Sequence, residues 1–519
     1  MKELNGNIVQ ARHAFDSAVE GLNIYLEEVN RLHDPIQRLP VELACFIFSL
    51  CFPRLPSLDI FDVGHATMAD YASRPIPLLL GSICRYWRRV VWASPQIWNI
   101  LWLQVTPHAT MTRSHMLIEW LTRSGQLPLY VCMFQCDQPQ RYHYHHDKLT
   151  AARDSIYHMI DTLTCHAGRI KVLHLLLDAS FISRFGRHST HMVATESIME
   201  SLFIERYHGY GDWSHSHRGD QAMFNLVQKP SPTHVSLVSV DFKLVNIRWE
   251  NVTSIEVASC RPIEALEILQ LVRQLRRFKF GASGVDRELG RYPRITHFTL
   301  TTLDIIDYVS PKFFNIIICP ALENFSCYNL DAETAACLVL LFNRSACPLK
   351  HFTIKGEDIF DLVNVLRATP LLTHLSFLEC RSLNRTLESL DFIQTLCSQK
   401  RGGSALIEEL FLRNLCSLSF SIPLGGSYLF TISPIISRLR RVISQKMSLR
   451  PLLRIRVEVV LSADVTNAWN SGGNLGDYVI GHDSLVEIME LGQDGVEIEV
   501  LDTKGLDLIL LSQHFNEMF

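Results

Sequence analysis

Three stretches of the chain, LENFSC (residues 322–327), LKHFTI (349–354) and LTHLSF (372–377), repeat one frame with apolar residues at positions one, four and six. Variants of this frame begin at Ile170, Val235, Val252, Leu275, Ile295, Ile407 and Leu452. From Val252 to Leu372, successive frames begin 23, 20, 27, 27 and 23 residues apart. A period of about 20–29 residues is typical of leucine-rich repeats.

Helical patterns lie between the repeated frames. Residues 263–274 and 358–368 each carry apolar residues at three- and four-residue spacing. A strand, a helix and a further strand form a parallel pair with a right-handed crossover. We therefore expect a mixed α/β fold whose main part is a right-handed leucine-rich-repeat-like solenoid, interrupted by insertions at about 183–234 and 425–450.

The polar residues between the apolar positions of each frame predict a binding surface. Side chains alternate between the two faces of a strand, so these residues share the face opposite the core, which is the concave face of such a solenoid. We expect this face to be polar and to bind a target protein. The residues that it nominates are Glu256, Lys279, Thr299, Ser326, Thr353 and Ser376.

The first segment, about residues 8–33, predicts a single helix. Its apolar residues Phe15, Ala18, Leu22, Tyr25, Val29 and Leu32 follow a heptad spacing, which Asp34-Pro35 ends. Two interpretations stay open at this point. The seam either joins two copies of the chain as a homodimer, or packs on the chain's own domain.

Residues 35–52, PIQRLPVELACFIFSLCF, predict a short helix that begins at Pro40 and has one apolar face of Leu43, Ile47, Phe48 and Cys51. A loop and a second helix over about 78–92 follow, with Leu79, Ile83, Trp87 and Val91 on one face. So small a unit cannot bury all its apolar side chains by itself, so they face either another protein or the domain that follows in the chain.

These residues carry a resemblance. The chain resembles an F-box at Ile36, Leu39, Pro40, Glu42, Leu43, Ile47, Phe48, then Ile83, Cys84, Trp87, Arg88, Ala93, Ser94, Pro95, Ile97 and Trp98. The helix-to-strand stretch of residues 117–129 is similar to the F-box-like proteins that abound in mushroom-forming fungi. The loop between the first two helices is longer than in a minimal F-box.

The resemblance implies a substrate-recognition subunit of an SCF-type cullin–RING ubiquitin ligase. The F-box would bind the Skp adaptor and, through it, the cullin, while the solenoid would bind a target protein. The implied adaptor-binding residues are Ile36, Leu39, Pro40, Glu42, Leu43, Ile47, Phe48, Trp87 and Trp98. The alternative is a protein-interaction scaffold outside any ligase, whose helical unit docks on its own solenoid.

Composition excludes several classes of function. Of 519 residues, 47% are hydrophobic and the net charge is −4, so the chain is globular and has no basic field for nucleic acid or membrane. No apolar run reaches about 20 residues, and the start lacks a signal peptide. Fourteen cysteines without a C-x-x-C pattern indicate reduced thiols, hence a cytoplasmic or nuclear protein.

No catalytic constellation stands out, and we expect no cofactor and no metal. Phosphate-loop, dinucleotide and zinc-protease motifs are absent from the sequence. The histidines at 143, 145 and 146, near Cys132 and Cys136, match no closed zinc frame and are interpreted as solvated. The sequence therefore predicts a binding protein rather than an enzyme.

Four segments result. We expect an N-terminal helix at 1–34, an F-box-like domain at 35–104, the solenoid at 105–457 and an acidic C-terminal cap at 458–519. Residues 411–457 contain eight Arg or Lys and no acidic residue, whereas 458–519 contain twelve Asp or Glu and one Lys. In one interpretation the acidic segment packs beside the basic one and caps the solenoid. In the other, the basic segment is a patch that binds an acidic substrate.

Overall fold

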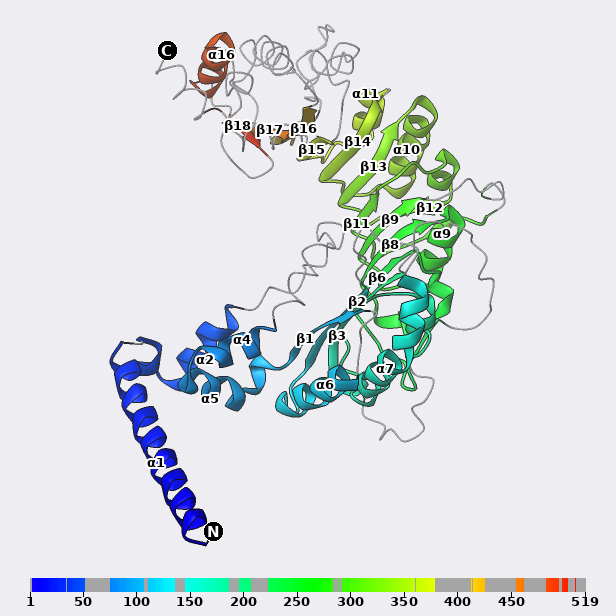
Figure 1. Cartoon of the computed structure of the whole chain (residues 1–519). Coiled ribbons are helices and arrows are strands. Elements are labelled where there is room, and N and C mark those ends of the chain that lie inside the picture. Colours follow the sequence, from blue (N-terminus) through cyan, green and yellow to red (C-terminus); the bar gives the residue numbers. More distant parts are fainter. Residues whose placement is uncertain are drawn as a thin grey trace, which may run out of the picture. The chain divides into compact units, whose positions relative to one another are not determined.

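The computed structural model describes residues 2–33, 35–51, 75–106, 111–135, 145–185, 196–206, 223–282, 289, 292–359, 361–378, 412, 414–424, 454–461, 482–493, 497–502 and 509 (Figure 1). The chain forms two compact units, Met1–Arg248 and Trp249–Phe519. The division falls inside the segment expected to be one solenoid, and the four-part division remains a prediction. Among the helices of the described ranges, none has both the length and the hydropathy needed to cross a bilayer.

The first unit begins with helices. These are α1 (Lys2–His33), the 3-10 helix η1 (Pro35–Arg38), α2 (Val41–Ser49), α4 (Ile76–Ile83), α5 (Arg85–Ala93) and the 3-10 helix η3 (Pro95–Ile97). As expected, α1 ends just before Asp34-Pro35, because the residue before a proline is disfavoured in the α conformation. We refer to η1, α2, α4, α5 and η3 together as the helical cluster.

A parallel sheet completes the first unit, in the order β1-β2-β3-β4-β6. Its strands are β1 (Ile100–Val105), β2 (Leu129–Gln135), β3 (Ile170–Leu177), β4 (Ser201–Arg206) and β6 (His234–Val238). Helices α6 (Met111–Arg123), α7 (His145–Cys165) and the short α8 (Ala179–Ile182) connect them, and β5 (Phe224–Asn225) pairs with β7 (Val245–Asn246). The 3-10 turns are η4 (Ala167–Arg169) and η5 (Phe242–Leu244).

The second unit holds a longer parallel sheet, in the order β8-β9-β11-β13-β14-β15-β16-β17-β18. Its strands are β8 (Ser254–Cys260), β9 (Arg277–Ala282), β11 (Thr302–Ile305), β13 (Asn324–Leu330), β14 (His351–Ile359), β15 (His374–Leu378), β16 (Ser417–Leu424), β17 (Arg454–Leu461) and β18 (Glu497–Asp502). Two short strands, β10 (Ile295–Thr296) and β12 (Ile317–Ile318), pair with each other in a separate parallel sheet.

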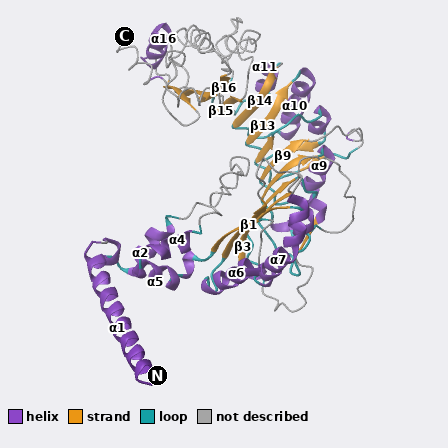
Figure 2. Cartoon of the chain, in the orientation of Figure 1, coloured by secondary structure: helices purple, strands orange, loops and turns teal. Residues whose placement is uncertain are grey.

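Helices alternate with the strands of the second unit. They are η6 (Trp249–Asn251), α9 (Pro262–Leu271), η8 (Pro311–Asn315), α10 (Ala332–Ser345), α11 (Leu362–Arg367) and α16 (His482–Gln493). Asp331 begins α10, because its Oδ1 accepts the backbone N–H of Thr334 at 2.7 Å. Helices α9 and α10 lie along the same side of the strands (Figure 2). The expected mixed α/β class with a large parallel sheet is confirmed.

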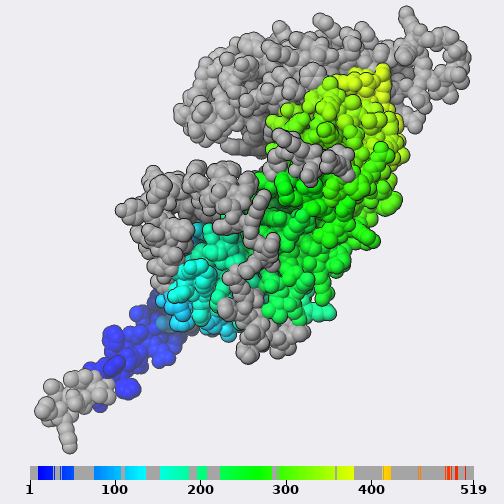
Figure 3. All heavy atoms as spheres, turned by 90° about the vertical axis from the view of Figure 1, so that its right-hand side faces the viewer, coloured from blue at the N-terminus to red at the C-terminus, as the bar shows by residue number. Residues whose placement is uncertain are grey.

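The core of the second unit follows the repeated frame. In the frames at Val252, Leu275, Leu322, Leu349 and Leu372, the first residue is buried just before its strand, and the fourth and sixth are buried within it, as at Leu349, Phe352 and Ile354. The apolar residues of the frame expected at Leu452 lie outside the residues whose burial is described. Phe325 stacks on Phe352 with ring centroids 5.8 Å apart, so the rings of neighbouring strands form one continuous core. In Figure 3 the repeats of this unit follow one another along the surface in chain order, from green to yellow.

The frame expected at Ile295 is wrong. Ile295 belongs to the separate pair of β10 and β12, and Phe298 is 73% exposed. The sheet uses Leu300, Leu303 and Ile305 instead, all fully buried. With Leu300, the steps from Val252 to Leu372 become 23, 25, 22, 27 and 23, which is the more regular period.

Of the frame expected at Ile407, with Leu410 and Leu412, only Leu412 lies within the described residues. Leu412 is a turn residue at positive φ, and the strand that follows is β16. Leu415, Leu418 and Phe420 are the buried residues of that frame. No frame is expected at β4, because this strand lies within residues 183–234, which the sequence favours as an insertion.

A left-handed residue recurs at the eighth position of the frame. Ser259 (φ 61°), Asn329 (φ 53°) and Gly356 (φ 98°) have it in the second unit. Positive φ is uncommon for residues other than glycine. Its recurrence at one frame position marks the same irregularity near the end of these strands, and the pairing register shifts there between Val257 and Cys260 and between Tyr328 and Leu330. The repeats are therefore alike in backbone as well as in apolar spacing.

Candidate partner-binding site

Pro40 sets the turn that leads into α2 within the helical cluster. The residue stands just before α2, with φ −50° and ψ 144°, rather than at the first helical position that we expected. Its carbonyl oxygen accepts the backbone N–H of Ala44 at 3.1 Å, which is the first bond of the helix. Proline thus fixes the direction in which the chain enters α2.

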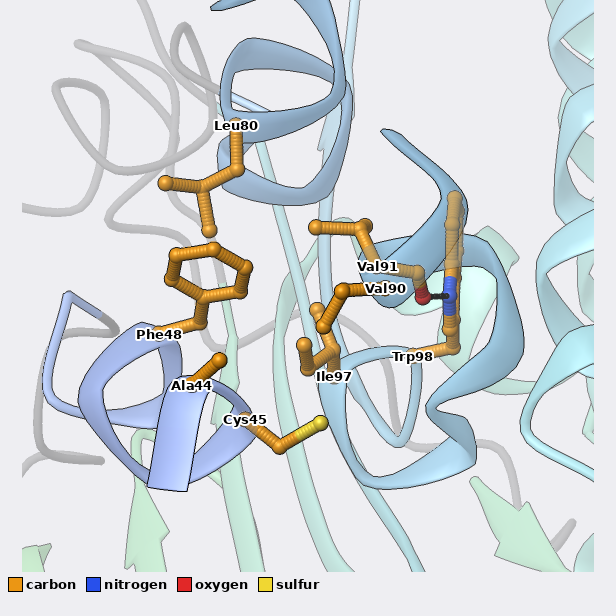
Figure 4. Packing of buried hydrophobic residues seen from close by; sticks show 8 residues of the cluster. All are labelled: Ala44, Cys45, Phe48, Leu80, Val90, Val91, Ile97 and Trp98. Atoms are coloured by element: carbon orange, nitrogen blue, oxygen red, sulfur yellow. Dashed lines mark hydrogen bonds between the residues drawn. The ribbon is translucent and has the colours of Figure 1, made fainter. Parts of the chain in front are cut away.

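One face of α2 is buried in the cluster. Ala44, Cys45 and Phe48 pack against Leu80 of α4, Val90 and Val91 of α5, and Ile97 and Trp98. Phe48 points toward Leu80, and the Trp98 indole Nε1–H donates to the Val91 carbonyl oxygen at 2.8 Å (Figure 4). The Phe48 ring also lies 4.7 Å from that of Trp87. The cluster therefore has a small core of its own.

The single helix expected over about 78–92 is two helices. Cys84 is extended (φ −154°, ψ 169°) and separates α4 from α5, and its Sγ accepts the Trp87 backbone N–H at 3.4 Å. The apolar face expected from Leu79, Ile83, Trp87 and Val91 is therefore interrupted. Leu79 and Ile83 of α4 are exposed, whereas Val91 of α5 is fully buried.

The outer face of α2 is apolar and exposed. Leu43, Phe46 and Leu50 follow one another at three- and four-residue spacing, so they share one side of the helix. All three are exposed, and Phe46 is 62% exposed. Glu42 and Pro40 are exposed beside them. A short helix with apolar side chains on both faces is suited to pack on a second protein.

The residues that the sequence nominated for adaptor binding divide into three groups. Pro40, Glu42 and Leu43 are exposed, and Ile36, Leu39, Ile47 and Trp87 are half-buried. Phe48 and Trp98 are buried in the cluster core, where they cannot contact another protein directly. Phe46, Leu50, Leu79 and Ile83 are exposed apolar residues that the nomination omitted.

The residues nominated for target binding lie in one row across the second unit's sheet, with one exception. The backbone register aligns Glu256, Lys279, Asp304, Ser326, Thr353, Ser376, Ser419, Arg456 and Glu499, which we call the polar row. Thr299 is not part of it. Thr299 precedes β11 and its hydroxyl donates to backbone carbonyls of Arg273 and Leu275, each at 2.9 Å.

Ion pairs cross the polar row. Lys279 Nζ lies 2.8 Å from Glu256 Oε1, on the adjacent strand. Lys355 of β14 reaches over β13 to Asp304 of β11, with 3.0 Å between Nζ and Oδ1. Glu256 and Ser326 are consequently buried rather than open to solvent as we expected. Lys279, Asp304, Thr353 and Ser376 are half-buried, so the row still presents polar groups at the surface.

The end of the sheet joins residues of the basic and acidic segments. Arg454 of β17 forms an ion pair with Glu499 of β18 and lies 3.5 Å from a carboxylate oxygen of Glu497. Of the other basic residues in 411–457, only Arg456 lies within the described ranges. These contacts agree with the interpretation in which the two segments pair with each other.

The described residues contain no group of three or more His, Cys, Asp or Glu side chains placed to hold a metal ion. Cys132 lies 3.7 Å from His174 Nδ1 inside the first unit, and burial strongly raises the pKa of its thiol. Burial likewise raises the pKa of the Cys327 thiol to about 12. These protonated thiols are core side chains rather than nucleophiles.

No protein-family model matches this chain, and no curated protein matches it.

Proposed function

We propose that the chain is the substrate-recognition subunit of an SCF-type cullin–RING ubiquitin ligase, active in the cytoplasm or nucleus. The helical cluster binds a Skp-family adaptor, and the second unit binds the target protein. The chain itself makes and breaks no covalent bond. It accelerates ubiquitin transfer by holding the target near the conjugating enzyme, which turns an encounter between two molecules into a reaction within one assembly.

The observation that carries the proposal is the exposed apolar face of α2. Leu43, Phe46 and Leu50 lie outside a cluster that already has its own core of Phe48 and Trp98. Burying such side chains on a partner is favourable by about 25 cal/mol per Å2 of apolar surface. The F-box-like residues Leu39, Pro40 and Glu42 lie at the N-terminal end of α2. The resemblance assigns adaptor contacts to these residues.

The test is capture of the purified Skp adaptor by the full chain. We expect Leu43→Asp/Phe46→Asp to abolish capture, because two carboxylates replace apolar contacts at the interface. The matched control is Leu340→Asp, which places the same charge at an exposed leucine of α10. Equal capture by the double variant and the control would refute the proposal.

Target binding is assigned to the polar row. The row combines ion pairs and hydroxyls that a protein partner can contact through hydrogen bonds, as protein interfaces commonly do. We expect Thr353→Arg/Ser376→Arg to reduce capture of targets from the native cell while leaving adaptor capture unchanged. Loss of both activities, or of neither, would show that the polar row is not the target site.

In the scaffold alternative, the chain's own residues cover the face of Leu39, Ile47 and Phe48, and Phe48 is buried in the cluster core beside Leu80. The exposure of Phe46 and Leu50 favours a separate partner instead. The two functions also differ in a direct reconstitution. A ligase subunit, mixed with adaptor, cullin and RING protein, supports ubiquitin transfer to a captured target, whereas a scaffold does not.

A further inference from the structure

Helix α1 carries an apolar seam that the chain leaves in solvent. Ala11, Phe15, Ala18, Leu22 and Tyr25 are all exposed, although they follow the heptad spacing of a helix–helix contact. Phe15 is 68% exposed. Among the described elements, only the adjoining η1 makes substantial contact with α1. The structure thus does not support the interpretation in which this seam packs on the chain's own domain.

A helix of this kind needs a partner. It spans 32 residues, about 48 Å, and exceeds four heptads. Helices in water draw most of their stability from packing of an apolar face, and this face has none within the described chain. Gly21 lowers the stability of the helix further, by roughly 1 kcal/mol relative to alanine. A Cβ at Gly21 would meet no atom within 4 Å, so no contact inside the chain requires a glycine there.

We propose that the partner is α1 of a second copy of the chain, packed in the antiparallel direction to form a homodimer. When the two seams run in opposite directions about a centre near residue 20, Ala18 meets Leu22 of the other copy. Phe15 then meets Tyr25. Each layer thus holds one residue from each copy. The two-fold axis that relates the copies produces every such layer twice.

The seam's side-chain volumes favour this direction over the parallel one. Phe15 and Tyr25 form aromatic layers in either direction, so the difference lies at the alanines. Antiparallel packing combines small with large at Ala18 and Leu22, and likewise at Ala11 and Val29. A parallel, in-register pair would instead place Ala18 against Ala18 and Ala11 against Ala11, and the two underfilled layers would destabilise the core.

Charge and the central glycine agree with the antiparallel arrangement. Residues 2–17 contain two basic and two acidic side chains, whereas 18–33 contain three acidic and one basic. Antiparallel packing brings the acidic half against the balanced half rather than against itself. Gly21 then lies beside its counterpart near the two-fold axis, where a missing side chain lets the helices approach closely.

The first experiment measures the mass of the full chain in solution by sedimentation, from about 1 to 100 µM. We expect the wild type to be a dimer and Leu22→Glu to be a monomer, with a dissociation constant raised at least about a hundredfold because a charge is buried in two layers. The matched control is Ile24→Glu, at an exposed position off the seam, which should remain a dimer. A monomeric wild type, or a dimeric Leu22→Glu, would overturn the proposal.

The second experiment determines the direction. A photocrosslinking amino acid, p-benzoylphenylalanine, replaces Phe15, and the crosslinked peptides are identified by mass spectrometry. We expect crosslinks to the region around Tyr25 of the second copy. Crosslinks to the region around residue 15 of the second copy would overturn the antiparallel arrangement. Neither experiment involves the Skp adaptor, so the outcome is independent of the proposed ligase function.

Discussion

Phe46 and Phe48 are two residues apart on α2 and allow the core of the helical cluster to be separated from its surface. Phe48 is 1% exposed and its ring lies 4.7 Å from that of Trp87. Phe48→Ala removes a buried ring and leaves a cavity, which costs about 3–5 kcal/mol, the lost ring pair included. Phe46 is 62% exposed, so Phe46→Ala should change stability by less than about 0.5 kcal/mol.

The assay is hydrogen exchange of the full chain, read on peptides that cover α4 and α5. Because about 1.4 kcal/mol corresponds to a factor of ten, Phe48→Ala should speed exchange there by two to three orders of magnitude. Phe46→Ala should leave exchange unchanged but weaken adaptor capture about tenfold or more, since the contact of one phenylalanine is lost. If both variants exchange alike, our account of the cluster core is wrong.

Two further predictions concern the second unit. Gly356→Ala should lower its unfolding temperature by several degrees, because φ is 98° and a Cβ would overlap Asn329 Oδ1, whereas Gly492→Ala, in open space on α16, should not. Burial lowers the pKa of His297, although its hydrogen bond to the Val272 carbonyl acts in the opposite direction. The unfolded chain therefore takes up the proton first, and stability should fall as pH drops from about 6.5; thermal unfolding of His297→Gln should show a weaker dependence. An equal pH dependence in both proteins would contradict this account.

The strands could be predicted where the apolar residues of the expected frame are the residues that the strand buries. Leu322, Leu349 and Leu372 gave correct strands, because burial on one side of a parallel sheet selects residues at fixed spacing. The frame failed at Ile295 because a second apolar series, beginning at Leu300, overlaps it. Apolar spacing alone could not distinguish them, although the steadier period from Leu300 could have done so.

The helical cluster shows a different limit. Leu43, Phe46, Ile47 and Phe48 are all apolar, so a sequence pattern cannot tell which side of so short a helix faces the core. The structure buries Phe48 and exposes Phe46 and Leu43, which reverses part of the expected face. The break at Cys84 was also missed, because the apolar residues on either side of it continue one helical period.

The polar row has a consequence for how recognition by this protein could diversify. Each strand contributes one side chain to the row, and in β8, β9, β11, β13, β14, β15 and β16 the residues on either side of it are buried in the core. Exchange of Ser376, for example, alters one point of the surface while Leu375 and Phe377 keep the strand in place. Under the proposed function, duplicated genes could thus change the target one strand at a time without selection for a new core.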